Sequence, residues 1–354
     1  MIETVGSPQS RCPFRRDPER KTIFREKNGF WWSDEMKCWM ISEPHAISQI
    51  LKDSNFTVHT YNFGEIAARL GISFIHQKLL RAHLPVAIEG KDHTSLRRKF
   101  DQAISTNTGR ALATFESYLA NAIPILFEAN TPSRFCVIDD LLKPSVRSAN
   151  LAIAGIEDCG VDDLESLPLF FDGSLSLKRR RYVEQLIENV YSSLPTAMSA
   201  EEKYFRIAML ALNMNTLLGS ISESFLTVVK RNAGINLKYM DWDPELPATA
   251  LPMIERRAIA NSKLCGNEIC AGDRVQSFVD IDGFEKDRGP QYSELYFAAG
   301  PHKCPGMNYS RKIWNILTRR MKTIDKRLRV LAIEYRPNDG IFNMLEKLEV
   351  ELHA

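Results

Sequence analysis

The sequence predicts a mainly α-helical protein with small β-sheets, and two patterns of apolar residues indicate it. Between residues 91 and 233, apolar residues recur every three or four positions, which is the spacing of helices that bury one face. Towards both ends, short aromatic or β-branched runs are separated by Gly and Pro, which is typical of strands and turns. Because no linker, repeat or low-complexity tract interrupts the sequence, we expect a single domain over residues 1–354.

The first predicted element is an aromatic hairpin. Two strands at 29–33 and 38–41 enclose an acidic turn. Ser42 as N-cap, with Pro44 in the first turn, then predicts a helix that ends near Leu51. Residues 60–88 lack clean periodicity, so we interpret them as packing, with a pocket-lining loop as the alternative.

Four periodic segments predict the helices of the middle of the chain: 96–104, 111–127, 182–191 and 204–229. A helix the length of the last would span roughly 39 Å, and because it is apolar on most faces we expect it to cross the core. The basic run at 178–181 is interpreted as a solvated face at the start of the third helix. In the final third, 264–275 and 329–352 predict strands.

Composition excludes several classes of protein. The chain has 354 residues, 44% of them hydrophobic and 25% charged, which is ordinary for a globular protein. Forty-six Lys and Arg against 44 Asp and Glu leave a formal charge of +2, so binding to nucleic acid or to an acidic membrane by bulk charge is not expected.

Location is predicted from the cysteines and the apolar stretches. The seven cysteines have no regular spacing, which argues against a disulfide framework and fits a reducing compartment. The N-terminus is polar, and the most apolar stretch, 207–221, is too short and too polar to cross a bilayer. We therefore expect a cytoplasmic protein with no membrane association.

One cysteine lies in a turn that suits a metal ligand. Cys304 is bounded by Gly and Pro and precedes a predicted helix from about Asn308 to Met321. At such a position, backbone N–H groups and the helix dipole stabilise a thiolate. The alternative is a buried structural cysteine.

The segment around Cys304 resembles the cysteine-ligand loop of the cytochrome P450 family. The family's Phe, Gly, basic residue, Cys and Gly correspond to Phe297, Gly300, His302, Cys304 and Gly306. Ala298 departs from the pattern, because the family usually has a second Gly there. The resemblance implies a cytochrome P450 fold with haem b between the long central helix and the Cys304 loop, and the Cys304 thiolate as the axial iron ligand.

Two further segments are similar to the same family. His93 and Arg97 are four residues apart, so they project from one helix face, as do the His and Arg that bond a haem carboxylate in the family. The strand at 252–258 looks like the one that carries a second such arginine; its register favours Arg256, with Arg257 as the alternative. Together with His302, these side chains would neutralise the two haem carboxylates.

Two features depart from the family. In the long helix, the family's acid and Thr correspond to Met214 and Asn215, with Thr216 one place late. We therefore predict Asn215 and Thr216 as the catalytic residues, with atypical proton delivery, because an amide does not relay a proton as a hydroxyl does.

The second departure is the family's Glu-x-x-Arg pair. It is reduced to Glu245 followed by Ala248, with Pro247 inside the would-be helix. Arg288 remains as a partner for Glu245 or Glu285.

The resemblance implies a haem-thiolate oxidoreductase, a monooxygenase acting on a small biosynthetic intermediate. A ferredoxin or flavodoxin would supply electrons by docking on the basic side of the Cys304 loop, near Arg98, Lys303, Arg311 and Lys312. The alternatives are a haem-dependent isomerase or dehydratase, and a non-catalytic P450-like helper of a partner enzyme. The sequence leaves the substrate open.

Overall fold

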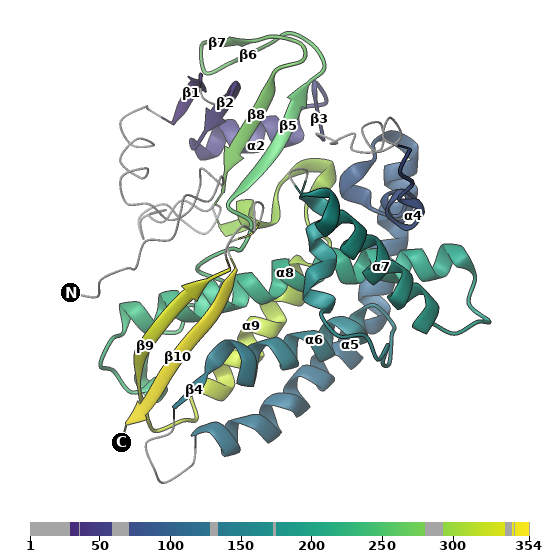
Figure 1. Cartoon of the computed structure of the whole chain (residues 1–354). Helices are drawn as coiled ribbons and strands as arrows, with labels where there is room; N and C mark the ends of the chain where they lie inside the picture. The colour runs from purple at the N-terminus through teal and green to yellow at the C-terminus, as the bar shows by residue number, and fades with distance from the viewer. Residues whose placement is uncertain are drawn as a thin grey trace.

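Helices dominate the middle of the chain and sheets its two ends in the computed structural model (Figure 1). The structure describes residues 29–34, 36–58, 71–127, 134–172, 175–279, 293–336, 342 and 344–353. Its α-helices are α2 (Pro44–Lys52), α4 (Ile75–Arg81), α5 (Gly90–Phe127), α6 (Lys143–Ile153), α7 (Leu177–Ser193), α8 (Ala200–Arg231) and α9 (Met307–Met321). Short helical turns are η1 (Pro85–Ala87), η2 (Val137–Leu142), η3 (Leu164–Phe171), η4 (Leu237–Tyr239), η5 (Ser293–Phe297) and η6 (Gly300–His302).

The described residues also form three small sheets. A five-stranded sheet has the order β1 (Phe30–Ser33), β2 (Cys38–Ile41), β8 (Arg274–Phe278), β5 (Met253–Ala258) and β3 (Phe56–Val58). The second sheet joins β4 (Arg134–Cys136), β10 (Leu345–His353) and β9 (Arg327–Tyr335). The hairpin of β6 (Ser262–Leu264) and β7 (Asn267–Ile269) forms the third. The predicted N-terminal hairpin is confirmed, because Phe30 pairs with Ile41 in an antiparallel register.

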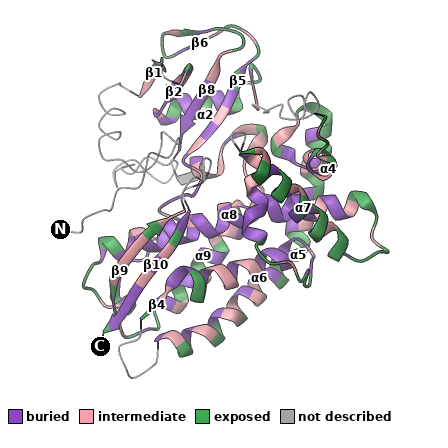
Figure 2. Ribbon diagram, viewed as in Figure 1, coloured by how far each residue is buried: buried purple, intermediate pink, exposed green. Residues whose placement is uncertain are grey.

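Helix α8 is the long helix that the sequence predicts. Ser199 caps it, because the Ser199 Oγ accepts a hydrogen bond from the Glu202 N–H at 3.2 Å. Acidic residues in the first turn and basic residues in the last complement the helix dipole. Most of its side chains are buried, as Figure 2 shows, so the helix crosses the core as expected.

Helix α5 joins two helices that the sequence predicts separately. Ile104 and Ala111 are both buried and seven residues apart, so the apolar face continues through the polar residues between them. The predicted break at 105–110 is therefore wrong, since that stretch forms nearly two turns of a helix of 38 residues. Helices α5 and α6 pack against each other (Figure 1).

Helix α2 has a different cap from the predicted one, and α4 is a helix that the sequence analysis did not predict. Glu43, not Ser42, caps α2, because the longer Glu43 carboxylate reaches the N–H groups of His45 and Ala46 at 3.0 and 2.6 Å. Helix α4 lies in the stretch that we interpreted as irregular packing. Its first N–H groups donate to the Glu184 carboxylate of α7 at 2.8 and 3.0 Å, so a residue over 100 positions away completes it. Residues 59–70 of that stretch lie outside the described residues.

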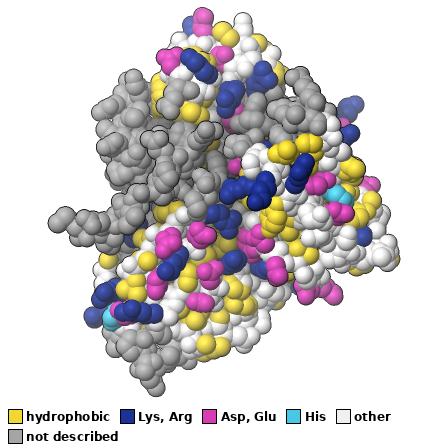
Figure 3. All heavy atoms as spheres, viewed as in Figure 1, with side chains coloured by type: hydrophobic (Ala, Val, Ile, Leu, Met, Phe, Trp, Pro, Cys, Tyr) yellow, Lys and Arg dark blue, Asp and Glu magenta, His cyan; other side chains and the backbone are white. Residues whose placement is uncertain are grey.

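Charged side chains of both signs mix on the face drawn in Figure 3, which agrees with the small net charge. In the basic run, Lys178, Arg179 and Arg181 are exposed, as expected of a solvated face. Arg180 is buried and donates to the Asp172 carbonyl at 2.7 Å. Within the described ranges, no helix combines the length and apolar character needed to cross a bilayer.

Candidate functional site

The Cys304 loop lies between η5 and α9 and is closed by backbone hydrogen bonds. The Cys304 N–H donates to the Phe297 carbonyl at 2.7 Å, and the Met307 N–H approaches the Cys304 carbonyl at 3.5 Å. Burial raises the pKa of the Cys304 thiol, while the N–H groups of Gly306 and Met307 and the charge of Arg97 act in the opposite direction. The start of α9 thus directs N–H donors at this sulfur, and Arg97 of α5 adds positive charge.

Two residues of the loop have left-handed backbone conformations. Gly300 has φ +68, and a Cβ atom there would collide with the Leu51 carbonyl oxygen at the end of α2. The loop therefore rests on α2 only because residue 300 has no side chain. Ala298 has φ +59, so the residue that departs from the P450 pattern occupies a conformation that favours glycine.

Ala298→Gly is expected to raise the free energy of unfolding by up to about 1 kcal/mol, because it removes the backbone strain of a left-handed alanine. Ala299→Gly is the matched control, since Ala299 has φ −137 and lies in the apolar core. That variant is expected to lower the unfolding free energy by about 0.5–1 kcal/mol. Urea unfolding measures both changes, and equal signs for the two variants would contradict the assignment of strain.

Four basic side chains gather near the sulfur from three parts of the chain. Helix α5 contributes His93 and Arg97, β5 contributes Arg256, and η6 contributes His302. The His93 and His302 rings lie 4.2 Å apart between centroids. Burial lowers the pKa of His302 against the effect of Glu89, and it lowers the pKa of His93 together with the charges of His302 and Arg97. Burial also lowers the pKa of Arg256.

Acidic groups balance part of this cluster. Glu89 approaches the His302 Nε2 at 3.1 Å, and it accepts hydrogen bonds from the Thr57 hydroxyl at 3.0 Å and the Val58 N–H at 2.9 Å. Although burial opposes it, these bonds hold the pKa of Glu89 below its usual value. Arg97 pairs with Asp101 one turn along α5, at 3.1 Å.

Helix α8 meets the loop beside Gly306. A Cβ atom on Gly306 would lie 3.7 Å from the Cys304 Sγ and 3.8 Å from the Asn213 Oδ1. The partly exposed positions of α8 fall on one stripe of the helix, which includes Phe205, Leu212, Asn213, Thr216 and Ser220. Thr216, predicted as catalytic, lies on this stripe, and its hydroxyl donates to the Leu212 carbonyl at 2.5 Å.

Asn215, the other residue predicted as catalytic, lies off that stripe. Its side chain is fully buried, and neither amide atom has a hydrogen-bond partner among the described residues. Asn213 is the residue that the sequence reasoning missed on this face. The signal was available, because residues 213 and 216 are three apart and so share a helix face, whereas 213 and 215 do not.

Comparisons with solved structures identify the fold of the chain. Neither the models of known protein families nor the curated proteins include a match to the sequence. Among solved structures, P450BioI in complex with an acyl carrier protein ligated to hexadec-9Z-enoic acid is 17% identical, with a TM-score of 0.71 over 95% of this chain and 98% of that one. The chain has the cytochrome P450 fold.

Two further solved structures agree. CalO2 is 14% identical, with a TM-score of 0.73 and 96% of each chain covered. CYP154A1 from Streptomyces coelicolor A3(2) is 18% identical, with a TM-score of 0.69 over 95% of this chain and 97% of that one. The predicted fold class is therefore confirmed.

The basic residues beside the Cys304 loop would suit a haem with two carboxylates. His93 Nε2 and His302 Nδ1 are buried ring nitrogens with no hydrogen-bond partner among the described residues. Leaving such an atom unsatisfied costs about 1–3 kcal/mol, and a ligand carboxylate beside each ring would remove that cost. Arg256 adds a buried guanidinium to the same place.

The structure separates the two arginines that the sequence left as alternatives. Arg256 is buried and close enough to His302 for its charge to affect that ring. Arg257, the next residue of the strand, is exposed and donates to the Gly272 carbonyl at 3.2 Å. Adjacent strand residues face opposite sides of a sheet, so only Arg256 shares a side with the histidines.

Arg256→Gln is expected to make haem dissociate at least about tenfold faster, because a hydrogen bond to a charged group is worth about 1.5–3 kcal/mol. Arg257→Gln is the control and is expected to leave the dissociation rate within about twofold of wild type. Transfer of haem to an excess of apomyoglobin measures the rate. Equal rates for the two variants would remove Arg256 from the cofactor site.

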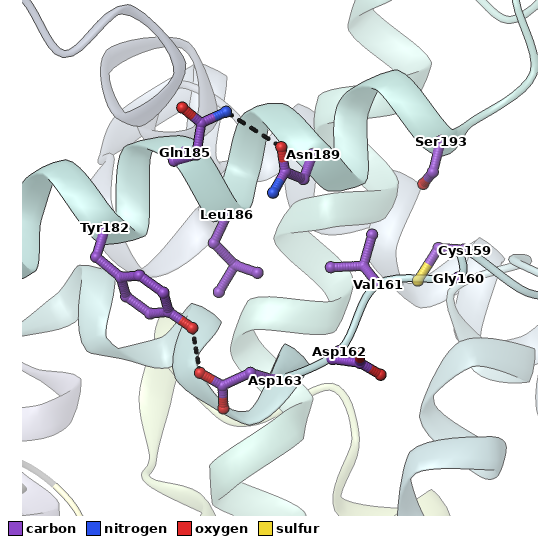
Figure 4. Close-up of a pocket in the computed structure, with 10 residues that line it drawn as sticks. All are labelled: Cys159, Gly160, Val161, Asp162, Asp163, Tyr182, Gln185, Leu186, Asn189 and Ser193. Carbon is purple, nitrogen blue, oxygen red and sulfur yellow. Dashed lines mark hydrogen bonds between the residues drawn. The ribbon is translucent and has the colours of Figure 1, made fainter.

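A separate surface hollow of about 520 Å³ lies between the loop at 159–163 and one side of α7 (Figure 4). Its lining includes no residue that the sequence predicts for the site. The Tyr182 hydroxyl donates to the Asp163 carboxylate there, and burial together with this bond raises the pKa of Tyr182 to about 12.

Arg288, predicted as a partner for Glu245, lies outside the described residues.

Proposed function

We propose that the protein is a cytoplasmic haem-thiolate monooxygenase of the cytochrome P450 family, with one domain over residues 1–354, acting on a small biosynthetic intermediate. The observation that supports it best is the convergence of Cys304 and four basic side chains in a chain with the P450 fold. Arg97 links the two parts of the site, because its charge acts on Cys304 and on both histidines.

Each residue of the site has a distinct role in this proposal. Cys304 would ligate the iron of haem b, and His93, Arg97, Arg256 and His302 would hold the haem carboxylates. When bound, the haem would supply an iron centre able to activate dioxygen. Phe297 closes the loop by accepting from the Cys304 N–H, and its ring and Pro305 would keep water from the sulfur. Gly306 lies where the loop meets α8, and a Cβ there would be in ordinary van der Waals contact with Cys304 and Asn213.

Proton delivery departs from that of typical P450s. The sequence of α8 has no acidic residue between Glu202 and Glu223. Thr216 donates its hydroxyl hydrogen to the Leu212 carbonyl, so its oxygen is available to accept a hydrogen bond from water. We propose that Thr216 and Asn213, which share a face of α8, orient water or substrate, whereas Asn215 is buried on another face, and that protons come through water or from the substrate itself.

The test of this function is spectroscopic. The protein reconstituted with haem, reduced and exposed to carbon monoxide is expected to show the absorption band that gives the family its name. Failure to bind haem under reconstitution would refute the proposal. A monooxygenase would be established if a compound from a metabolite panel is turned over only when a ferredoxin or flavodoxin and its reductant are present. The panel includes carrier-bound acyl chains, because P450BioI was solved with an acyl carrier protein.

Two alternatives have distinct signatures. Turnover without any electron donor would indicate a haem-dependent isomerase or dehydratase, for which the stretch of α8 without acidic residues, 203–222, suffices. A non-catalytic helper is favoured by the altered region at 241–252, where the described residues form no helix. Purification of a stoichiometric partner enzyme with a haem-free protein would establish that role.

A further inference from the structure

The segment at 241–252 packs between the Cys304 loop and two helices, although it forms no helix. The Trp314 Nε1–H of α9 donates to the Asp243 carbonyl at 2.9 Å. The Tyr296 hydroxyl of η5 donates to the Pro247 carbonyl at 3.3 Å. On the other side, the Ala248 N–H donates to the Ser224 hydroxyl of α8 at 3.2 Å. The segment is therefore fixed to α9, η5 and α8, three of the elements next to the Cys304 loop.

A charged contact links this segment to the loop. The Glu245 Oε2 lies 2.5 Å from the Arg311 Nε in an ion pair. The guanidinium of Arg311 lies 5.8 Å from the centre of the Phe297 ring, within the range of a cation–π contact. Phe297 in turn accepts the hydrogen bond from the Cys304 N–H. A continuous path of contacts thus runs from Glu245 through Arg311 and Phe297 to Cys304.

We propose that Glu245 and Arg311 are positioning residues that hold the Cys304 loop closed. Ala248 stands where the P450 pattern has the arginine of its Glu-x-x-Arg pair, and here the guanidinium comes instead from the helix that follows Cys304. The inference deepens the proposed function, on which its haem readout rests. Arg311 is then not available for docking an electron donor, because the Arg311 side chain is only 22% exposed and already paired with Glu245.

The first test uses the haem-free protein and needs no activity. Alkylation of each cysteine by iodoacetamide is followed by peptide mass spectrometry. Glu245→Gln and Arg311→Gln are each expected to raise the Cys304 rate three- to tenfold, because the loop opens more often. The double variant is expected to match the larger single effect, since the two residues act as one unit. Lys312→Gln, on the exposed side of the same helix, is the control and is expected to match wild type.

Buried cysteines separate local opening from global unfolding. Cys38 and Cys159 are buried, and both are far from the Cys304 loop in the sequence. Their alkylation rates are expected to stay unchanged in both variants. A parallel rise at all three cysteines would overturn the proposal, because the variants would then weaken the whole fold. Cys304 rates within twofold of wild type, or additive effects in the double variant, would overturn it as well.

The second test uses the haem-loaded protein. Glu245→Gln and Arg311→Gln are expected to lower the share of reduced, carbon monoxide-bound protein that absorbs at the thiolate position by at least threefold, with Lys312→Gln unchanged. An unchanged share in both variants would overturn the proposal. If the wild-type protein binds no haem but the slow alkylation of Cys304 still depends on Glu245 and Arg311, the proposed loop contact is supported and the proposed monooxygenase function is refuted.

Discussion

Replacing Cys304 with alanine is expected to abolish the carbon monoxide band of the reduced, haem-loaded protein while leaving the fold intact. The band requires a thiolate on the iron, and Cys304 is the sulfur that the start of α9 and Arg97 favour. The hydrogen bond that closes the loop comes from the Cys304 backbone, so alanine preserves it. Far-UV circular dichroism and the difference spectrum measure the two outcomes.

Cys159→Ala is the matched control for that experiment. Cys159 is also buried, and burial raises the pKa of its thiol, but it lies by the hollow of Figure 4, which includes no predicted site residue. Its variant is expected to keep the full band. A band that survives in Cys304→Ala would show that another residue ligates the iron.

Gly300→Ala is expected to destabilise the protein by about 3 kcal/mol or more and to impair haem binding. Two costs combine: the left-handed conformation of an alanine, about 1–2 kcal/mol, and the collision of its Cβ with the Leu51 carbonyl. The Lys52 Cα, 3.0 Å from that Cβ, blocks the nearby alternative position. The loop would therefore have to leave α2. Urea unfolding and haem titration measure the loss.

Gly266→Ala isolates the backbone cost. Gly266 has φ +81 in the turn of the β6–β7 hairpin, and a Cβ there meets no atom within 4 Å. Its variant is expected to lose only about 1 kcal/mol and to bind haem normally. A Gly300→Ala variant as stable as Gly266→Ala would mean that the loop does not depend on its contact with α2.

The sequence predicts those parts of the site that depend only on residues close together in the chain. The Cys304 turn, the shared face of His93 and Arg97 and the strand of Arg256 each follow from local spacing, and the structure brings them together. The exact α8 face was harder, because Asn213 and Asn215 are chemically alike and, in the sequence, only their spacing from Thr216 distinguishes them. The haem contacts of these residues remain predictions.

Contacts between distant residues were beyond the sequence reasoning. Glu184 completes α4 from a separate helix, and Glu245 finds Arg311 rather than a residue three places along. Each is a short-range polar contact between segments whose proximity is set by the packing of other elements. A single sequence encodes that packing only as apolar periodicity, which specifies the buried face of each helix but not its neighbour.

The contact between Glu89 and His302 joins residues 213 positions apart. During synthesis at about 5–20 residues per second, the first half of the carboxylate-binding cluster would leave the ribosome roughly 10–40 s before the second. Glu89 can already bond Thr57 and Val58 in that interval, because all three are early in the chain. Under the proposed function, haem capture would then be a late event of biogenesis, and the nascent chain would present half of the proposed site before Cys304 exists.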